Sequence, residues 1–149
     1  MLLSISLNEN NYDVSIHHNN KNCTSNTNIH GLTIDNNSIY IKNNGYIPNG
    51  SEKSVLHQDN KIIVMNDNKS KIEPNLFIDE YDVEASHGAY IGKFDEEELF
   101  YLNSRGLDEN KCYELLINGF LLNEFNITDD VKDDLKKIIK KYWRWKNEL

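Results

Sequence analysis

The sequence predicts a mainly β fold followed by a helical tail, and three observations lead to this. From Asp13 to about Ser86, apolar residues come in short β-branched runs closed by Asn, Asp or Gly, as in strands separated by turns. From Asp95 on, they follow the three-and-four spacing of amphipathic helices. The β runs are also too short and irregularly spaced for matched hairpins. They favour a β-solenoid, whose coils stack by parallel pairing, over a meander of hairpins.

Short runs with strand-like alternation occur throughout the first half of the chain. The clearest strand candidates are Val14–Ile16, Leu32–Ile34, Ile39–Ile41, Ile62–Val64 and Leu76–Ile78. Asn and Gly tolerate positive φ, so we predict turns at Asn36-Asn37, Asn43–Gly45 and Pro48–Gly50. Asparagine-rich turns suit a solenoid, because stacked Asn side chains hydrogen-bond between successive coils.

Three helices are predicted in the tail. Asp95 caps the first, which has three carboxylates in its first turn, and Gly106 ends it. The second begins at Asp108 and runs to about Phe125, and Thr128 caps the third. The apolar stripe of the third helix consists of Val131, Leu135, Ile138, Tyr142 and Trp145. Such a tail has too few apolar positions to fold alone, so we expect the β domain or another protein to cover the stripe.

These patterns divide the 149 residues into three segments. Residues 1–27 form an irregular segment or a first coil, residues 28–94 the β core, and residues 95–149 a helical domain. A chain of this length, with 38% hydrophobic residues, buries a modest core and is too short for a large multi-domain enzyme.

Charge and cysteine content restrict the partners and the compartment. The net charge of -8 and the pI near 5.0 oppose binding to phosphate backbones, which argues against nucleic acid. We interpret the lysines of residues 132–146 as the solvated side of a helix, with a site for an acidic partner as the alternative. Cys23 and Cys112 form no disulfide framework, and no apolar run approaches the ~20 residues of a membrane span. A soluble, cytoplasmic protein with neither an export signal nor a membrane partner is therefore expected.

No catalytic motif stands out. None of the five histidines, His17, His18, His30, His57 and His87, has the helical spacing to a carboxylate that a zinc hydrolase needs. There is no GxSxG elbow, and the stretch Gly88–Gly92 lacks the lysine and hydroxyl of a phosphate loop. The acids from Asp95 to Glu98 are read as a helix start rather than a cation site. We therefore predict a protein that is not an enzyme.

His87 is the most informative histidine, because Ser86-His87-Gly88 falls where the strand half meets the helical half. In one interpretation, His87 fixes that corner by hydrogen bonds. In the other, it offers a neutral imidazole to a metal ion or cluster.

The segment Asp82–Gly106, DVEASHGAYIGKFDEEELFYLNSRG, closely resembles the C-terminal signature of the SufB/SufD family of iron-sulfur cluster assembly proteins. The resemblance continues through Leu115–Phe120. It also runs back, more weakly, through Pro74–Ile78, Ile62–Val64 and Gln58, so that it covers roughly residues 30 to 126.

The resemblance implies a right-handed parallel β-helix followed by a helical domain. It also implies pairing of two such proteins through their β-helices, and docking of a SufC-type ATPase by each helical domain. In that family the histidine of the SHG motif, which falls on His87, is implicated in cluster assembly. The ATPase contact would come from the helical residues Leu99, Phe100, Tyr101, Arg105, Leu116, Asn118, Gly119 and Phe120.

The chain departs from the family pattern in three ways. It is far shorter than typical members. Ala85 stands where the SufD-type motif often has cysteine, and Asp59 and Asn68 stand near the place of the SufB-type cysteine. Thiolates are the preferred ligands of iron-sulfur clusters, so we expect no stably bound cofactor and at most a transient cluster at an inter-subunit site.

The sequence thus predicts a SufD-like scaffold or adaptor of the SUF machinery. It would pair with a SufB-type partner or with itself, and bind a SufC-type ATPase. Two alternatives remain: an iron or cluster carrier that uses His87, with Cys112 and the other histidines as further candidate ligands, and a stand-alone structural interaction protein.

Overall fold

The computed structural model describes residues 2–6, 9–34, 37–66, 69–123 and 128–147, with side chains from residue 9 to residue 140 outside the gaps and Asn123. It divides into two compact units, Met1–Lys93 and Phe94–Leu149, called here the β unit and the helical unit.

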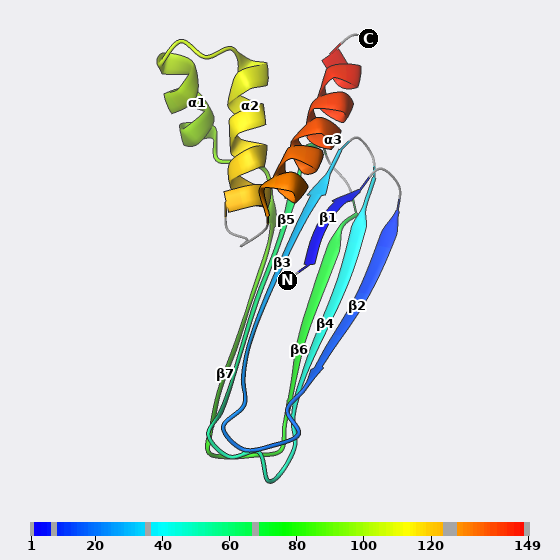
Figure 1. Cartoon of the computed structure of the whole chain (residues 1–149), viewed down its shortest axis with the longest axis vertical. Coiled ribbons are helices and arrows are strands. Elements are labelled where there is room, and N and C mark those ends of the chain that lie inside the picture. The colour runs from blue at the N-terminus through cyan, green and yellow to red at the C-terminus, as the bar shows by residue number, and fades with distance from the viewer. Residues whose placement is uncertain (1, 7–8, 35–36, 67–68, 124–127, 148–149) are drawn as a thin grey trace. The chain divides into compact units, whose positions relative to one another are not determined.

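The β unit consists of strands in two parallel sheets. One sheet has the order β1-β3-β5-β7 and the other the order β2-β4-β6, so the chain alternates between them (Figure 1). Because all pairs among the described strands are parallel, the expected parallel pairing is confirmed and a hairpin meander is wrong for these strands. The strands are β1 Leu2–Ser6, β2 Asn10–His17, β3 Thr24–Thr33, β4 Ile39–Ile47, β5 Ser54–Val64, β6 Lys71–Ile78 and β7 Val83–Gly92.

The turn predicted at Asn43–Gly45 is wrong, because these residues lie inside β4. Asn43 is fully buried and donates to Asn60 Oδ1 at 2.9 Å, and Asn44 accepts from Asn75 Nδ2 at 3.0 Å. The Asn43 bond crosses from one sheet to the other, whereas the Asn44 bond joins paired residues of β4 and β6. Asparagine side chains thus do hydrogen-bond between stacked segments, but within strands rather than in turns. Asn36 of the other predicted turn lies outside the described residues.

The core of the β unit is apolar at its centre and tightly packed. Ile29, Ile39, Ile41 and Ile62 form its buried cluster. Gly45 faces this interior so closely that an added Cβ would overlap Leu56. The core therefore has no room for a side chain at that position.

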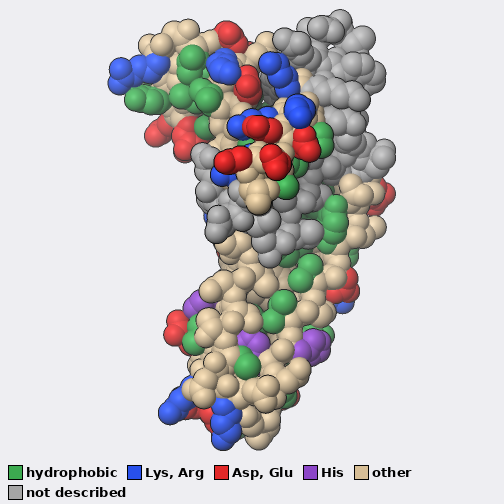
Figure 2. Space-filling model, in the orientation of Figure 1, with side chains coloured by type: hydrophobic (Ala, Val, Ile, Leu, Met, Phe, Trp, Pro, Cys, Tyr) green, Lys and Arg blue, Asp and Glu red, His purple; other side chains and the backbone are tan. Residues whose placement is uncertain are grey.

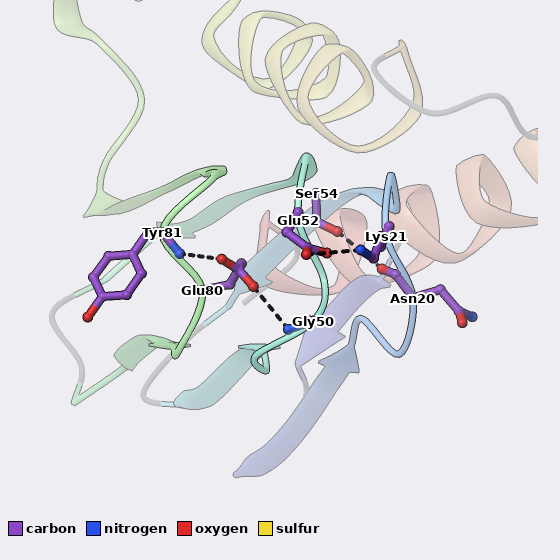
Figure 3. A network of polar contacts seen from close by, with 7 residues as sticks. All are labelled: Asn20, Lys21, Gly50, Glu52, Ser54, Glu80 and Tyr81. Carbon is purple, nitrogen blue, oxygen red and sulfur yellow. Dashed lines mark hydrogen bonds and ion pairs between the residues drawn. The ribbon is translucent and has the colours of Figure 1, made fainter.

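Polar contacts join turns that are far apart in sequence (Figure 3). Lys21 Nζ lies 3.0 Å from Glu52 Oε1, and the Glu80 carboxylate accepts the backbone N–H groups of Gly50 at 2.9 Å and Tyr81 at 2.8 Å. These two bonds, chiefly that from Gly50, lower the pKa of Glu80. Gly50 has φ 91°, as a turn glycine should in the predicted Pro48–Gly50 turn.

The helical unit contains α1 Glu96–Ser104, α2 Glu109–Asn118, a π-helical turn η1 Gly119–Asn123, and α3 Asp129–Asn147. The cap predicted at Asp95 is present, since it accepts from Glu97 N, and Gly106 has φ 87° after α1. Asp108, predicted as the start of the second helix, accepts from Lys111 N and caps α2. The third helix, α3, begins at Asp129, directly after the predicted cap Thr128. Local capping chemistry therefore sets where α1 and α2 begin. None of the described helices is long and apolar enough to span a membrane.

Burial along α3 differs from the predicted stripe. Ile139 is buried, whereas Val131 and Ile138, both assigned to the stripe, are exposed. The buried face is thus rotated by one residue at this point, since Ile138 and Ile139 are neighbours on the helix. Phe125 and the side chains of Tyr142 and Trp145 lie outside the described residues.

Candidate functional site

The sequence suggests that His87 lies at a hinge between the two halves. Instead, His87 lies in the middle of β7. Strand pairing with β5 continues past it as far as Gly92, so the backbone at His87 is extended. Among the described strands, β7 is the last in its sheet and pairs with β5 alone. The side chain of His87 is exposed on this edge strand.

The register assigns the side chains of the motif to two faces of the sheet. Paired residues of parallel strands lie side by side on the same face. Thr27, Gln58 and His87 are paired in one row, and Thr27 and Gln58 are buried, so this row belongs to the inner face. The next row pairs His57 with Ser86 and belongs to the outer face. His57 and His87 therefore lie on opposite faces of the sheet.

Residues of β5 hold the backbone of the motif on both sides of His87. On the outer face, His57 Nδ1 lies 2.7 Å from Ser86 Oγ, and His57 Nε2 lies 3.6 Å from Glu84 Oε1. On the inner face, Asn60 Nδ2 donates to the carbonyl of Gly88 at 3.0 Å. Both neighbours of His87 are thus anchored, which fixes the point from which its ring projects.

Behind His87 lies a buried group of amides. Asn43 Nδ2 donates to Thr27 Oγ1 at 3.2 Å and to Asn60 Oδ1 at 2.9 Å. Gln58 Nε2 donates to Asn43 Oδ1 and to the carbonyl of Asn75, both at 3.4 Å. The other end of that side chain differs: Gln58 Oε1 is buried and has no hydrogen-bond partner among the described residues.

The described residues contain no group of three His, Cys, Asp or Glu side chains arranged to hold a metal ion. Cys112, proposed as a further ligand, is buried in the helical unit, where its Sγ lies 3.5 Å from Asn103 Oδ1. Asp59 forms an ion pair with Lys61 at 2.9 Å, and Asn68 lies outside the described residues. Of the predicted ligands, His87 on β7 and His17 on β2 both have exposed side chains on edge strands in this part of the chain, and of the two only His87 belongs to the Ser86-His87-Gly88 motif.

Apolar side chains are exposed along the last two strands of the β unit. Tyr90 and Ile91 on β7 are 49% and 43% exposed, and Phe77 and Ile78 on β6 are 49% and 40% exposed. β6 ends its own sheet and contains Pro74, which has no N–H to donate. The described part of β7 contains no proline, so its backbone is the better template for another strand.

Among the side chains that the structure describes in the helical unit, the most exposed aromatic ones lie on α1. It has no buried residue, and Phe100 and Tyr101 are 75% and 56% exposed. Figure 2 shows apolar side chains in this region with acidic and basic groups beside them. A hollow of about 370 Å³ lies next to this surface, lined by Asp95, Glu97, Glu98, Tyr101, Leu102 and Leu116.

The remaining predicted contact residues have mixed environments. The guanidinium of Arg105 lies over the ring of Tyr101 at 5.1 Å, and Leu99 is half-buried. The ring of Phe120 packs edge-on against Phe94, with centroids 6.3 Å apart, so it takes part in packing inside the unit. Asn118 Oδ1 is buried without a partner among the described residues. A Cβ at Gly119 would meet no described atom within 4 Å.

The sequence interpretation missed that His57 and Asn60 contact the strand of the motif and that Gln58 pairs with His87. The signal that could have found them is the coil repeat, since Asn44 and Asn75 are hydrogen-bonded across 31 positions. Stepping back by about one coil from Ser86-His87-Gly88 leads to the segment from His57 to Asn60.

Comparisons with known proteins identify the family to which this chain is similar. Residues 5–120 match the family model described as "SUF system FeS cluster assembly, SufBD core domain". The chain is 34% identical over 116 residues to the iron-sulfur cluster assembly protein SufD of Bacillus subtilis, a match covering 75% of this chain and 26% of that protein. It is 39% identical over 101 residues to the SufBD family protein PH1385 of Pyrococcus horikoshii, covering 64% of this chain and 22% of that protein.

A third relative is SufD of Escherichia coli, 36% identical over 62 residues, which cover 42% of this chain and 14% of that protein. The matched region thus spans about a quarter or less of the length of these relatives. The family model itself covers well over half of this chain. The chain therefore belongs to the SufB/SufD family of the SUF system of iron-sulfur cluster assembly.

Proposed function

We propose that this protein is a non-catalytic scaffold and adaptor subunit of SUF iron-sulfur cluster assembly in the cytoplasm. It pairs through the free edge of β7 with a SufB-type protein or a second copy of itself, and it binds a SufC-type ATPase through its helical unit. The observation that carries the proposal is the edge strand β7, which presents the motif histidine His87 beside exposed apolar residues.

Pairing at β7 explains several features of that strand at once. Free backbone donors and acceptors at a sheet edge add a further strand readily, and exposed Tyr90 and Ile91 supply apolar area for the contact. At Gly88, a Cβ would approach Asp59 Oδ1 no closer than 3.5 Å, so the packing of this chain does not require a glycine there. A partner backbone that approaches closely would require it. The two sheets would then be the faces of a short right-handed parallel β-helix.

The pairing brings His87 to a boundary between two subunits. A lone imidazole holds an iron ion weakly, but a second subunit adds the thiolates that an iron-sulfur cluster prefers. The cluster is cargo in this proposal, held transiently and passed on. The alternative of an independent carrier has less support, because the described part of this chain contains no group of three His, Cys, Asp or Glu side chains that could hold a metal ion.

The helical unit has the features of a docking surface. The exposed ring of Tyr101 lines a hollow whose wall is apolar at Leu102 and Leu116 and acidic at Glu97. Phe100, the most exposed ring of α1, precedes Tyr101 on the same helix. Such a surface fits a partner segment that offers an apolar anchor next to Lys or Arg. We assign this role to a surface segment of the ATPase.

Docking is tested by titrating the purified chain with a SufC-type ATPase in a calorimeter. Phe100→Asp should weaken binding by about 2 kcal/mol or more, as for other hot-spot aromatics, without lowering thermal stability. Tyr81→Asp is the matched control, because it makes the same kind of change at a 99% exposed ring in the β unit. Equal binding by wild-type protein and the Phe100 variant, or no binding by folded wild-type protein at about 10 µM, contradicts the docking proposal.

Pairing is tested by size-exclusion chromatography with light scattering, with the chain alone and with a SufB-type protein. Ala89→Lys places a charge at an exposed position of β7 and should abolish the paired species. Tyr81→Lys introduces the same charge away from that strand and should leave pairing intact. A wild-type chain that stays monomeric in both samples overturns the pairing proposal.

A further inference from the structure

Gln58 is buried in the β unit, and packing alone does not explain why one of its polar atoms lacks a hydrogen bond within the described part of the chain. It is 3% exposed, and its Nε2 makes three contacts at 3.4 Å, to Asn43 Oδ1 and to the carbonyls of Asn43 and Asn75. Its Oε1 is buried and has no partner among the described residues. A buried carbonyl oxygen without a hydrogen bond is uncommon in folded proteins and calls for a functional reason.

The motif histidine is a side chain in the same row that can supply a donor. Gln58 and His87 are direct partners in the register of β5 and β7, so both side chains leave the same face of the sheet from strands about 4.8 Å apart. Both neighbours of His87 are held by β5, Ser86 through its side-chain hydroxyl and Gly88 through its backbone carbonyl. The His87 side chain itself is exposed, so a rotation about its own bonds is the change that the contact with Gln58 requires.

We infer that Gln58 is a positioning residue for His87: its buried Oε1 accepts the Nδ1–H of the His87 ring, which leaves Nε2 as an outward-facing acceptor. The inference rests on the proposed function only for the use of that acceptor, namely ligation of iron or a cluster at the β7 edge. Nδ1, three bonds from Cα, lies near the sheet, where the Gln58 amide is. Nε2, at the far side of the ring, faces outward. Ligating histidines commonly have their second ring nitrogen fixed in this way by an oxygen acceptor.

The tautomer of His87 tests this directly on the full chain without metal or partner. The protein is labelled with ¹⁵N-histidine, and long-range ¹H–¹⁵N correlation spectra are recorded at about pH 8.5, above the ordinary pKa of histidine. His87 should carry its proton on Nδ1. A free imidazole in water prefers Nε2–H, so an Nε2–H signal for His87 in the wild-type protein overturns the inference even if every variant fails to fold.

Two substitutions of Gln58 separate positioning from structure. Gln58→Glu keeps an acceptor oxygen but loses the donor to Asn43 and Asn75, whereas Gln58→Met loses both. If Gln58 positions the ring, His87 keeps Nδ1–H in the Glu variant and changes to mainly Nε2–H in the Met variant. If Gln58 is only structural, both variants behave alike.

Thr27→Val is the control for a general disturbance of the row of paired residues that contains Gln58 and His87. Thr27 pairs with Gln58 on the other side and accepts from Asn43 Nδ2, so its loss disturbs the same interior without removing the acceptor for His87. The tautomer should stay unchanged, and a change in this variant contradicts the inference. Failure of ATPase binding would defeat the proposed function but leave these spectra unaffected.

Discussion

The interior of the β unit and helix α1 bury their side chains very differently. The β unit encloses a cluster of isoleucines and, beside it, a group of hydrogen-bonded amides around Asn43 and Asn60. α1 has no buried residue, although it contains Leu99, Phe100 and Tyr101. Packing and strand pairing hold the β unit, whereas caps at either end define α1. The stability of the protein should therefore depend on the first region and its binding on the second.

The largest expected effect comes from opening the isoleucine cluster. Ile62→Ala removes a fully buried side chain and should lower the free energy of unfolding by about 2–5 kcal/mol, because of lost apolar contact and the cavity left behind. Urea denaturation followed by circular dichroism measures it. A loss below about 1 kcal/mol would mean that the interior is less tightly packed than described.

Overfilling the same interior should have the next largest effect. Gly45→Ala places a methyl group against Leu56, with Gln58 Nε2 and Leu76 Cδ2 each at 3.1 Å, and should cost about 1–3 kcal/mol. Gly119→Ala is the matched control: it has open space and helical φ and ψ, so it should be neutral or stabilising by up to about 1 kcal/mol. Equal changes in the free energy of unfolding for the Gly45 and Gly119 variants would contradict the difference in packing between the two regions.

Loss of the α1 cap should have a smaller and local effect. Asp95→Ala removes the acceptor of Glu97 N and should cost about 1 kcal/mol. Hydrogen exchange of the α1 amides should speed up, while that of the β5 amides should not. Asp95→Asn keeps a capping oxygen and should exchange like wild type. Faster exchange throughout the β unit in the alanine variant would show that α1 is needed for more than binding.

The smallest effect concerns pH. The Gly50 and Tyr81 amides lower the pKa of Glu80 in the folded state, so its contribution to stability is present above the ordinary value of 4.5 and is lost as pH falls through the folded pKa. Glu80→Gln should be slightly less stable than wild type at neutral pH, and the difference should vanish in acid. Denaturation midpoints measured from neutral pH to below 4.5 check this. A difference that persists unchanged in acid contradicts the assignment.

Local chemistry made part of this structure predictable. The caps at Asp95 and Asp108 and the stop at Gly106 depend on neighbours within four residues, and the sequence identified all three. The local sequence predicts a turn at Asn43, because Asn and Gly tolerate positive φ. The hydrogen-bond partner of Asn43 is Asn60, which lies 17 positions away and so escapes a local reading. The sequence predicts a hinge at His87 because the strand-like pattern ends and the helical pattern begins near it. Its strand continues because of pairing with β5, which no local pattern reveals.

The parallel register also bears on how the chain folds. The chain passes through the opposite sheet before it forms the next strand of the same sheet. The side chain of Asn44, for example, is hydrogen-bonded to Asn75, 31 residues later in the sequence. Topologies dominated by such distant partners fold slowly, in about milliseconds to seconds for small domains. During synthesis, β7 is the last of the described strands to emerge, so it pairs with β5 after the other strands are available. The β7 edge, which we propose for pairing with a partner, is therefore completed after the rest of the β unit.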